Sequence, residues 1–351
     1  MGLRRRRQSA LVSMKQGVRA LVNHRVKNFV RESFSIDCQL VGASPLRSFE
    51  SSSELEALLV ELGFEPHVVQ IQPGPLQGNF QFASTDSGAV VRFRAAAGFT
   101  LVCPRKPQFV CVGLNRDGHP GRIVVHGQPL VEHAVAGCSL NLTDSFFQVW
   151  PGGDALMTLL PRQPLLEALA LSSAERCLQW IQDHNQLQLT PQAHGAMAEL
   201  LMAALEPAAS KPIDLLRGVV ELLNDQALVA SVRFKKPTRH DLVAQLIGLG
   251  AQLSGPLSLD AVVEQLGCSR RSLIQGCTEL MGIGPIELLR AQRLERVHQE
   301  LRTSFDQEQP MPSASVGDIA QRFGFRSRGH FAAAYQEQYG QSPSQTLNQA
   351  A

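Results

Sequence analysis

The sequence lacks the features that mark membrane proteins, disulfide-stapled proteins and most enzymes. No uninterrupted apolar run approaches the roughly 18 residues that a transmembrane helix needs. The seven cysteines are odd in number and form no Cys-x-x-Cys pair, which predicts reduced, buried thiols and not a disulfide framework or a zinc site. A His-x-His with a later Glu and His, a nucleophile motif and a phosphate loop are also missing. We therefore expect no catalytic residue and no cofactor.

Net charge is small as well, and it is unevenly placed. The chain carries +2 overall. Residues 1–38 hold nine Arg or Lys against two acids, residues 39–238 hold 14 against 18, and residues 239–351 hold 10 against 11. The share of basic residues in 239–351 is low for a domain that binds phosphates. The position of each charge must therefore matter more than the net charge of the domain.

Two stretches near the C-terminus repeat one short design. In Ile319–Pro343 apolar residues recur at helical spacing on both sides of a break at Gly324, which predicts a helix, a tight turn and a second helix. Leu257–Pro285 has the same pattern. At an offset of 58 residues the matching pairs are Leu273 with Phe331, Cys277 with Tyr335, Gly282 with Gly340, and Pro285 with Pro343. Two helix-turn-helix units joined by one helix, Pro285–Leu301, are thus predicted.

The repeat resembles a known family. The second unit reads A-x-x-x-G-F-x-x-x-x-x-F and then Y-G-x-S-P, which is similar to the DNA-binding domain of AraC/XylS-type bacterial transcription regulators. The resemblance covers Arg239–Leu347. It implies a cytoplasmic, sequence-specific regulator of double-stranded DNA, usually an activator that contacts RNA polymerase.

The second helix of each unit would read the DNA. Side chains that do not face the core are left to contact bases, and the helix amides near Ser269 and Ser327 can bind phosphates. The predicted DNA-binding residues are Ser269, Arg270, Arg271, Ile274, Gln275, Arg326, Ser327, Arg328 and His330. A basic residue is common in the family where this chain has Gln275 and Ala333. The first unit is therefore expected to contribute more specificity than the second.

Residues 34–160 have a different character. Short β-prone runs separated by Gly, Pro, Asn and Asp predict a mainly β domain, barrel-like or a sandwich, with a capped helix over Ser51–Leu62 ahead of it. The family resemblance implies a sensing or dimerisation role for such a domain, with a small-molecule effector and a homodimer as its expected partners. The fold class is then α+β multidomain, with a helical region and linker over 161–237 and an all-α domain over 238–351.

Several side chains in the β domain invite a sharper function. His119, His126 and His133 recur every seven residues, but an odd spacing does not keep them on one face of a strand, so we expect no metal ligand there. Cys103, Cys111 and Cys138 are expected to be buried core thiols. Arg92 and Arg94 would either point to water or bind an anionic effector.

Alternatives remain open for the N-terminal extension and for the function of the whole chain. Residues 1–33 form a basic amphipathic extension, for which a solvated extension is favoured over a phosphate-binding arm or an organellar transit peptide. For the whole chain, a regulator is favoured over a small-molecule or protein-binding module with weakened DNA binding, and over a cupin-like enzyme.

Overall fold

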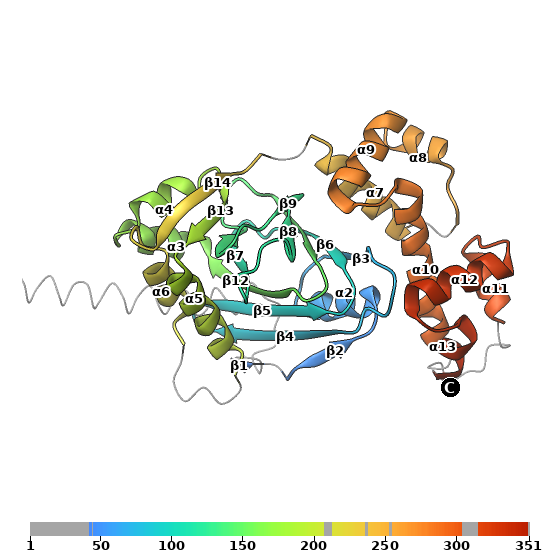
Figure 1. Ribbon diagram of the computed structural model, residues 1–351, viewed down its shortest axis with the longest axis horizontal. Helices are drawn as coiled ribbons and strands as arrows, with labels where there is room; N and C mark the ends of the chain where they lie inside the picture. Colours follow the sequence, from blue (N-terminus) through green and yellow to red (C-terminus); the bar gives the residue numbers. More distant parts are fainter. Residues whose placement is uncertain are drawn as a thin grey trace, which may run out of the picture.

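The computed structural model describes residues 42–43, 45–206, 213–235, 238–252, 255–303 and 315–349. The basic extension predicted for residues 1–33 lies outside these residues. Two sheets with flanking helices form the N-terminal part, and a group of helices forms the C-terminal part (Figure 1). This is the α+β architecture that the sequence predicted, except that the β domain consists of two separate sheets and not one closed barrel.

The larger sheet is antiparallel and has nine strands. Its order is β1 (Gly42–Ala43), β4 (Gly78–Thr85), β5 (Gly88–Ala95), β12 (Asp154–Pro161), β7 (Phe109–Asn115), β10 (Ala134–Ala136), β13 (His184–Leu189) and β14 (Leu228–Arg233), with β2 (Arg47–Phe49) also paired to β4. Both faces are buried. In β5, Val90 packs toward helices whereas Val91 and Phe93 pack toward the other sheet, which explains its near-continuous apolar sequence.

The smaller sheet has five antiparallel strands and lies against the first. Its order is β3 (His67–Gln70), β6 (Phe99–Pro104), β11 (Asp144–Val149), β8 (Ile123–Val125) and β9 (Gln128–Pro129). The core between the sheets is rich in phenylalanine, including Phe49, Phe80, Phe93 and Phe99. Helix α2 (Ser52–Glu61) closes one end of this core, and Ser51 caps it by accepting a hydrogen bond from Glu54 N, as predicted.

One strand prediction was wrong and several strands were missed. The β-prone run at residues 139–144 predicts a strand, but it forms a turn that ends where β11 begins at Asp144. The Gly-Gly pair in Pro151–Asp154 predicts a turn that closes the β region, but β12 follows this turn and becomes a central strand. Strand β12 reads DALMTLLP, an apolar run whose period does not separate a strand from a helix.

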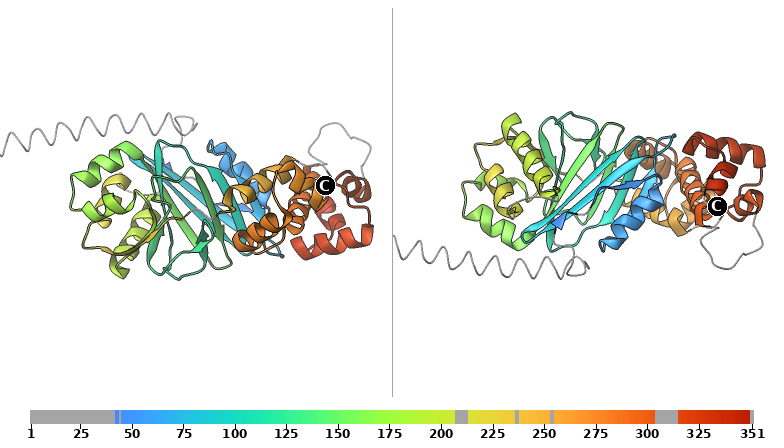
Figure 2. Two further views of the ribbon diagram at one scale, coloured as in Figure 1. Left: turned by 90° about the horizontal axis from the view of Figure 1, so that it is seen from above. Right: turned by 90° about the horizontal axis from the view of Figure 1, so that it is seen from below.

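The middle region is helical, as predicted, but it also completes the larger sheet. Its helices are α3 (Arg162–Ala170), α4 (Glu175–Trp180), α5 (Pro191–Ala204) and α6 (Leu215–Leu222), and they cover the outer face of the nine-stranded sheet (Figures 1 and 2). Strands β13 and β14 alternate with these helices and were not predicted. The apolar stripe of α5 and α6, including Leu201 and Val219, packs on that sheet face.

The C-terminal helices follow the predicted order. They are α7 (His240–Gln252), α8 (Leu259–Gln265), α9 (Arg270–Met281), α10 (Pro285–Thr303), α11 (Val316–Arg322), α12 (Arg328–Tyr339) and α13 (Pro343–Gln349). Among the described residues, no helix combines the length and apolar character needed to cross a membrane.

Candidate nucleic-acid interface

The first helix-turn-helix unit consists of α8 and α9. Ser269 caps α9 by accepting a hydrogen bond from Ser272 N at 3.1 Å, and Gly282 ends the helix in the left-handed conformation with φ of 73°. Leu273 and Cys277 are fully buried, as the sequence predicted. These contacts fix which side of α9 faces away from the core.

The outward side of α9 carries the predicted DNA-binding residues. Arg271 and Ile274 are exposed, and Ile274 is one of few large apolar side chains that remain so, at 44%. Arg270 is also exposed, but its Nε donates to Asp260 Oδ1 on α8 at 2.7 Å. Gln275 is half-buried and donates to Glu279 at 2.7 Å. Of the two arginines, Arg271 is the one whose guanidinium is not already directed at a carboxylate in the described structure.

The second unit consists of α11 and α12. A capping box between Ser315 and Asp318 starts α11, and Ser327 starts α12 by accepting from His330 N at 3.4 Å. Arg326, Ser327, Arg328 and His330 are all exposed at the N-terminal end of α12. Two cationic side chains thus stand at the positive end of a helix dipole, where a phosphate or a guanine edge would be stabilised.

Helix α10 joins the two units by belonging to both of their cores. Leu288 and Leu289 pack with the first unit, whereas Leu294, Val297 and Leu301 pack with the second. The spacing of the two outward surfaces is therefore set by one continuous helix of 19 residues (Figure 1).

The sequence of α10 favours ion pairs within the helix, and the structure shows that several of its charged side chains also contact other elements. The Arg293 guanidinium lies 5.1 Å from the centre of the Phe325 ring, and that of Arg296 lies 5.1 Å from the Phe323 ring. Glu295 accepts hydrogen bonds from Tyr339 Oη at 3.0 Å and from Ser53 N at 2.8 Å. Helix α10 is thus fixed by polar and cation–π contacts to elements on more than one side.

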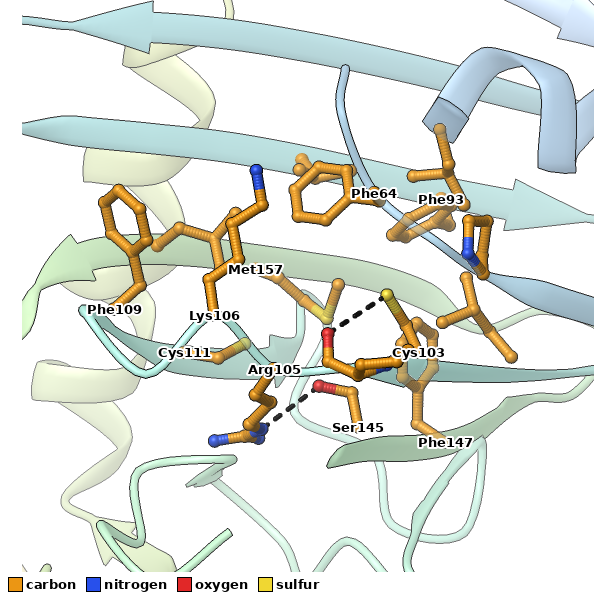
Figure 3. A pocket seen from close by; sticks show the side chains of 16 residues that line it. Phe64, Phe93, Cys103, Arg105, Lys106, Phe109, Cys111, Ser145, Phe147 and Met157 are labelled. Carbon is orange, nitrogen blue, oxygen red and sulfur yellow. Dashed lines mark hydrogen bonds between the residues drawn. The ribbon is translucent and has the colours of Figure 1, made fainter. Parts of the chain in front are cut away.

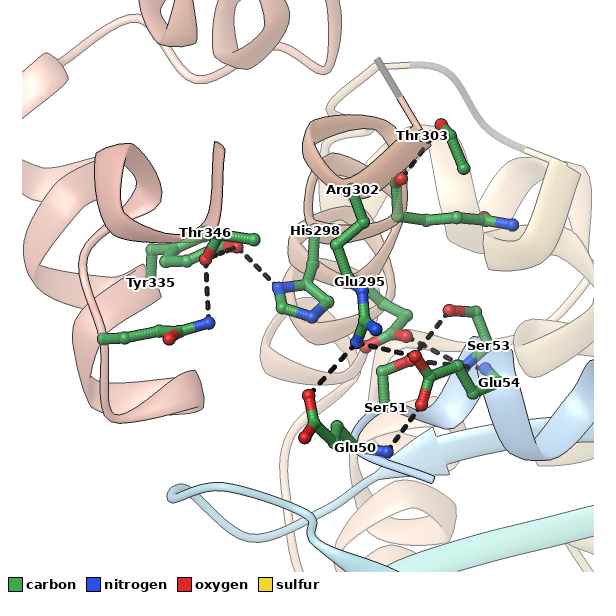
Figure 4. Close-up of polar contacts among 12 residues, drawn as sticks. Glu50, Ser51, Ser53, Glu54, Glu295, His298, Arg302, Thr303, Tyr335 and Thr346 are labelled. Atoms are coloured by element: carbon green, nitrogen blue, oxygen red, sulfur yellow. Dashed lines mark hydrogen bonds and ion pairs between the residues drawn. The ribbon is translucent and has the colours of Figure 1, made fainter. Parts of the chain in front are cut away.

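Polar contacts connect α10 to the N-terminal domain. Arg302 forms ion pairs with Glu54 at 2.6 Å and Glu50 at 3.4 Å, beside the bond from Ser53 to Glu295 (Figure 4). On the other side of α10, His298 and Tyr335 are hydrogen-bonded within the second unit. Helix α10 is therefore in polar contact with both α2 and the second unit.

The five-stranded sheet separates the C-terminal helical domain from a cavity. Along β11, Phe147 faces the core between the sheets whereas Phe146 packs with the first helix-turn-helix unit, and β6 repeats this alternation with Leu101 and Val102. Gln148 Nε2 reaches across to donate to Leu280 O, in the last turn of α9, at 2.9 Å.

The cavity lies between the two sheets, and about 650 Å³ of space is free of atoms there when the open solvent at its mouth is included. Its wall is largely apolar, with Phe64, Phe93, Phe109, Phe147 and Met157, and Arg105 and Lys106 lie at its edge (Figure 3). An apolar hollow with a few polar groups is the usual character of a small-molecule site. Arg105 and Lys106 were not singled out in the sequence, although a cationic pair between two prolines directly after a buried strand was a usable signal.

Arg105 is a half-buried cation whose hydrogen bonds go to neutral groups. Its guanidinium donates to Ser145 Oγ at 3.1 Å and to Gly137 O at 2.7 Å. Burial lowers the pKa of Arg105 from its ordinary value. Within the described part of the chain no carboxylate forms an ion pair with Arg105. A partly buried positive charge without an ion-pair partner favours an anion nearby.

The other side chains that the sequence singled out have ordinary structural partners. Arg92 forms a bidentate pair with Asp154, at 2.7 and 2.6 Å, so it is not available to an anionic effector. Cys103, Cys111 and Cys138 are buried, and burial raises the pKa of each thiol, so the expectation of core thiols is confirmed.

The three histidines at seven-residue intervals do not gather at one place. His119 is exposed, and His133 packs edge-to-face on His194 with ring centres 5.4 Å apart. His126 lies in the turn between β8 and β9, which is the kind of loop position that the sequence favours for these histidines, but its side chain is buried there.

A family model described as a helix-turn-helix domain matches residues 262–349. These residues contain both recognition helices and the linker helix described above. The C-terminal domain is an AraC-type helix-turn-helix domain.

Relatives of the AraC-type domain include regulators. A probable thc operon regulatory protein of Rhodococcus erythropolis is 29% identical over 185 residues, which are 50% of this chain and 48% of that protein. The chain thus matches about half the length of this relative. A transcriptional regulator from Chromobacterium violaceum is 28% identical over 31% of this chain and 90% of its own, with a TM-score of 0.27. The AraC-like activator CuxR is 13% identical over 73% and 96%, with a TM-score of 0.36.

Proposed function

We propose that this chain is a sequence-specific DNA-binding transcription regulator whose N-terminal domain binds a small-molecule effector. The observation that carries the proposal is the pair of matched helices, α9 and α12, whose capped N-terminal ends leave Arg271 and Arg328 exposed on the outside of the AraC-type domain.

Each helix has a defined part in the proposed complex. Arg271 would bind a guanine edge through two hydrogen bonds while Ile274 contacts a thymine methyl group. Arg326, Arg328 and His330 would bind the next major groove, about 34 Å further along one face of the duplex. Since one rigid helix fixes the two surfaces, DNA that bends easily would bind more tightly.

The effector would be an apolar molecule with an anionic group. The cavity wall favours an aliphatic or aromatic body, and Arg105 supplies a half-buried positive charge for a carboxylate. The effector would touch Phe147 on one side of β11, while Phe146 and Gln148 on the other side contact α9. A shift of this strand is the proposed signal.

Further parts of the proposal rest on the family resemblance. They are a cytoplasmic homodimer, activation through contact with RNA polymerase, and the absence of enzymatic activity. One matched relative is a probable operon regulatory protein.

The test is an electrophoretic shift assay with DNA from immediately upstream of the protein's own gene. We expect Arg271→Ala to weaken specific binding by about 1–3 kcal/mol and to relax one base preference. Compared with Arg271→Ala, Arg328→Ala should weaken binding to that site and to scrambled DNA by more similar amounts. It should also lower the salt dependence of the DNA affinity.

Arg217→Ala is the matched control. Arg217 is an exposed arginine of α6, on the far side of the larger sheet, so its loss should leave DNA binding unchanged. If wild-type protein binds the upstream and scrambled sequences equally, and Arg271→Ala changes neither affinity, a binding module without sequence readout would be the better description.

A further inference from the structure

Three metal-ligating side chains meet where the AraC-type domain joins the smaller sheet. His126 comes from the turn after β8, Asp144 is the first residue of β11, and His240 is the first residue of α7. His126 N donates to Phe146 O at 2.7 Å, which places His126 beside Phe146 and two residues from Asp144 along β11. The sheet thus presents His126 and Asp144 on one face, and the DNA-binding domain contributes His240 to them.

The ligand atoms of these residues are spaced as for a shared metal ion. His240 Nε2 lies 3.1 Å from His126 Nδ1 and 3.3 Å from Asp144 Oδ2, and all three atoms lie within 4.8 Å of one another. Tetrahedral zinc has bonds of about 2.0–2.2 Å to nitrogen and oxygen, so its ligand atoms stand about 3.3 Å apart. The two observed distances therefore lie at the ideal spacing or slightly below it.

Hydrogen bonds among these three residues cannot satisfy all three ligand atoms at once. A single Nε2–H on His240 can point well at only one of its two neighbours, His126 Nδ1 or Asp144 Oδ2. If His126 donates to His240 instead, then an unprotonated Nε2 faces a carboxylate oxygen. In the first case one of the two neighbours receives no hydrogen bond from Nε2, and in the second case two lone pairs oppose each other, which is costly. One cation would satisfy all three atoms at once.

The surroundings also suit a bound cation. His240 is fully buried, and the rings of Phe146 and Phe234 pack against the two histidines, with centres 5.0 Å from His240 and 5.1 Å from His126 respectively. On the other side of His240, Nδ1 lies 3.6 Å from Asp241 Oδ1. This separation is longer than a hydrogen bond, so Nε2 is the nitrogen of His240 that has close polar neighbours, and those neighbours are the other two residues of the cluster.

We propose that His126, Asp144 and His240 bind one divalent transition-metal ion of the zinc type and thereby tie the AraC-type domain to the N-terminal domain. Two imidazoles and one carboxylate select zinc and its neighbours over Mg²⁺ and Ca²⁺, which prefer oxygen ligands. Asp144 is partly exposed, so a water molecule can reach the fourth position.

Co²⁺ is used as the probe. In a site with few nitrogen and oxygen ligands Co²⁺ absorbs visible light, whereas Zn²⁺ does not. The full chain is stripped with a chelator, titrated with Co²⁺, and then back-titrated with Zn²⁺. We expect one Co²⁺ per chain, with d–d absorption but no thiolate charge-transfer band, displaced by one equivalent of Zn²⁺. Zn²⁺ should also raise the thermal unfolding midpoint of the stripped protein.

Variants assign the ion to these residues. Asp144→Asn, His240→Gln and His126→Asn should each weaken Co²⁺ binding at least about tenfold. Asparagine is chosen at position 126 because His126 has φ of 49°, a conformation that asparagine tolerates. His119→Ala, which removes an exposed histidine near β8, is the matched control and should bind Co²⁺ as the wild type does.

Two results would overturn the proposal, and neither depends on DNA binding. One is the absence of d–d absorption when Co²⁺ is in tenfold excess over folded wild-type protein. The other is absorption that survives in all three ligand variants, which would mean an adventitious ion elsewhere.

Discussion

At the scale of single residues, Glu56 of α2 has an unusual environment. Its Oε1 accepts a hydrogen bond from Val68 N at 2.6 Å, and burial raises its pKa from 4.5 to about 7, with a smaller contribution from the charge of Glu295 on α10. The Glu56 side chain therefore stays protonated to a higher pH in the folded protein than in the unfolded chain. Between pH 4.5 and about 7 the unfolded chain loses this proton while the folded chain keeps it, so stability falls as pH rises through that window.

The Glu56→Gln variant should lose this pH dependence. The amide keeps an oxygen that can accept from Val68 N but has no charge to bury. We expect the midpoint of thermal unfolding to fall less between pH 4.5 and 7 in Glu56→Gln than in the wild type. Glu61→Gln, at an exposed position of the same helix, is the control. Parallel curves for wild type and Glu56→Gln would show that Glu56 titrates normally.

At the scale of elements, the packing of α12 depends on a series of buried hydrogen bonds. Tyr335 is fully buried, and its hydroxyl hydrogen-bonds to His298 on α10 and to Thr346 on α13 (Figure 4). This hydroxyl thus joins three helices of the second unit. Burial lowers the pKa of His298, in keeping with a neutral imidazole there.

Tyr335→Phe should therefore destabilise the second unit. Loss of the hydroxyl leaves His298 Nδ1 and Thr346 without this partner, at a cost of about 1–3 kcal/mol. Urea denaturation followed by helical circular dichroism should show the loss, and Gln336→Ala, at an exposed position of α12, should not. Equal midpoints for Tyr335→Phe and wild type would mean that water replaces the hydroxyl.

Elements were predictable from sequence where their signals are local. Ser269, Gly282, Ser327 and Gly340 mark the ends of α9 and α12 within the helices themselves, so both helices and their outward residues could be named in advance. Strand β12 carries no comparable mark, because its place is decided by pairing with β5 and β7. The same holds for the His126 and His240 cluster, whose two histidines are 114 residues apart.

At the scale of the whole molecule, the larger sheet ends in an exposed edge. Strand β14 is its last strand, and Val229 in β14 is 56% exposed. Unpaired strand edges readily pair with another chain. Sedimentation should show the homodimer that we propose, held by residues before Arg239. Val229→Lys should weaken it, because a lysine on the edge opposes pairing. A monomer at micromolar concentration would contradict the proposal.

We propose that binding in the cavity affects the DNA-binding helices through the smaller sheet. Gln148 of this sheet donates a hydrogen bond to α9. Decanoate, an apolar carboxylate, serves as a probe, and decanol is its uncharged counterpart. We expect decanoate to raise the thermal midpoint of wild-type protein more than decanol does, and Arg105→Met to abolish that difference. At a concentration 100 times its Kd, decanoate would add about 2.7 kcal/mol of stability.

Gln148→Leu then separates binding from transmission. The variant removes the hydrogen bond to Leu280 O but leaves the cavity wall, which is formed by Ser145 and Phe147 of the same strand, in place. Decanoate should still stabilise Gln148→Leu, whereas its effect on DNA affinity should shrink, because coupling between two sites depends on contacts that differ between their two states. An undiminished effect on DNA affinity would place the route elsewhere, with the ion pairs between α2 and Arg302 of α10 as the next contact to cut.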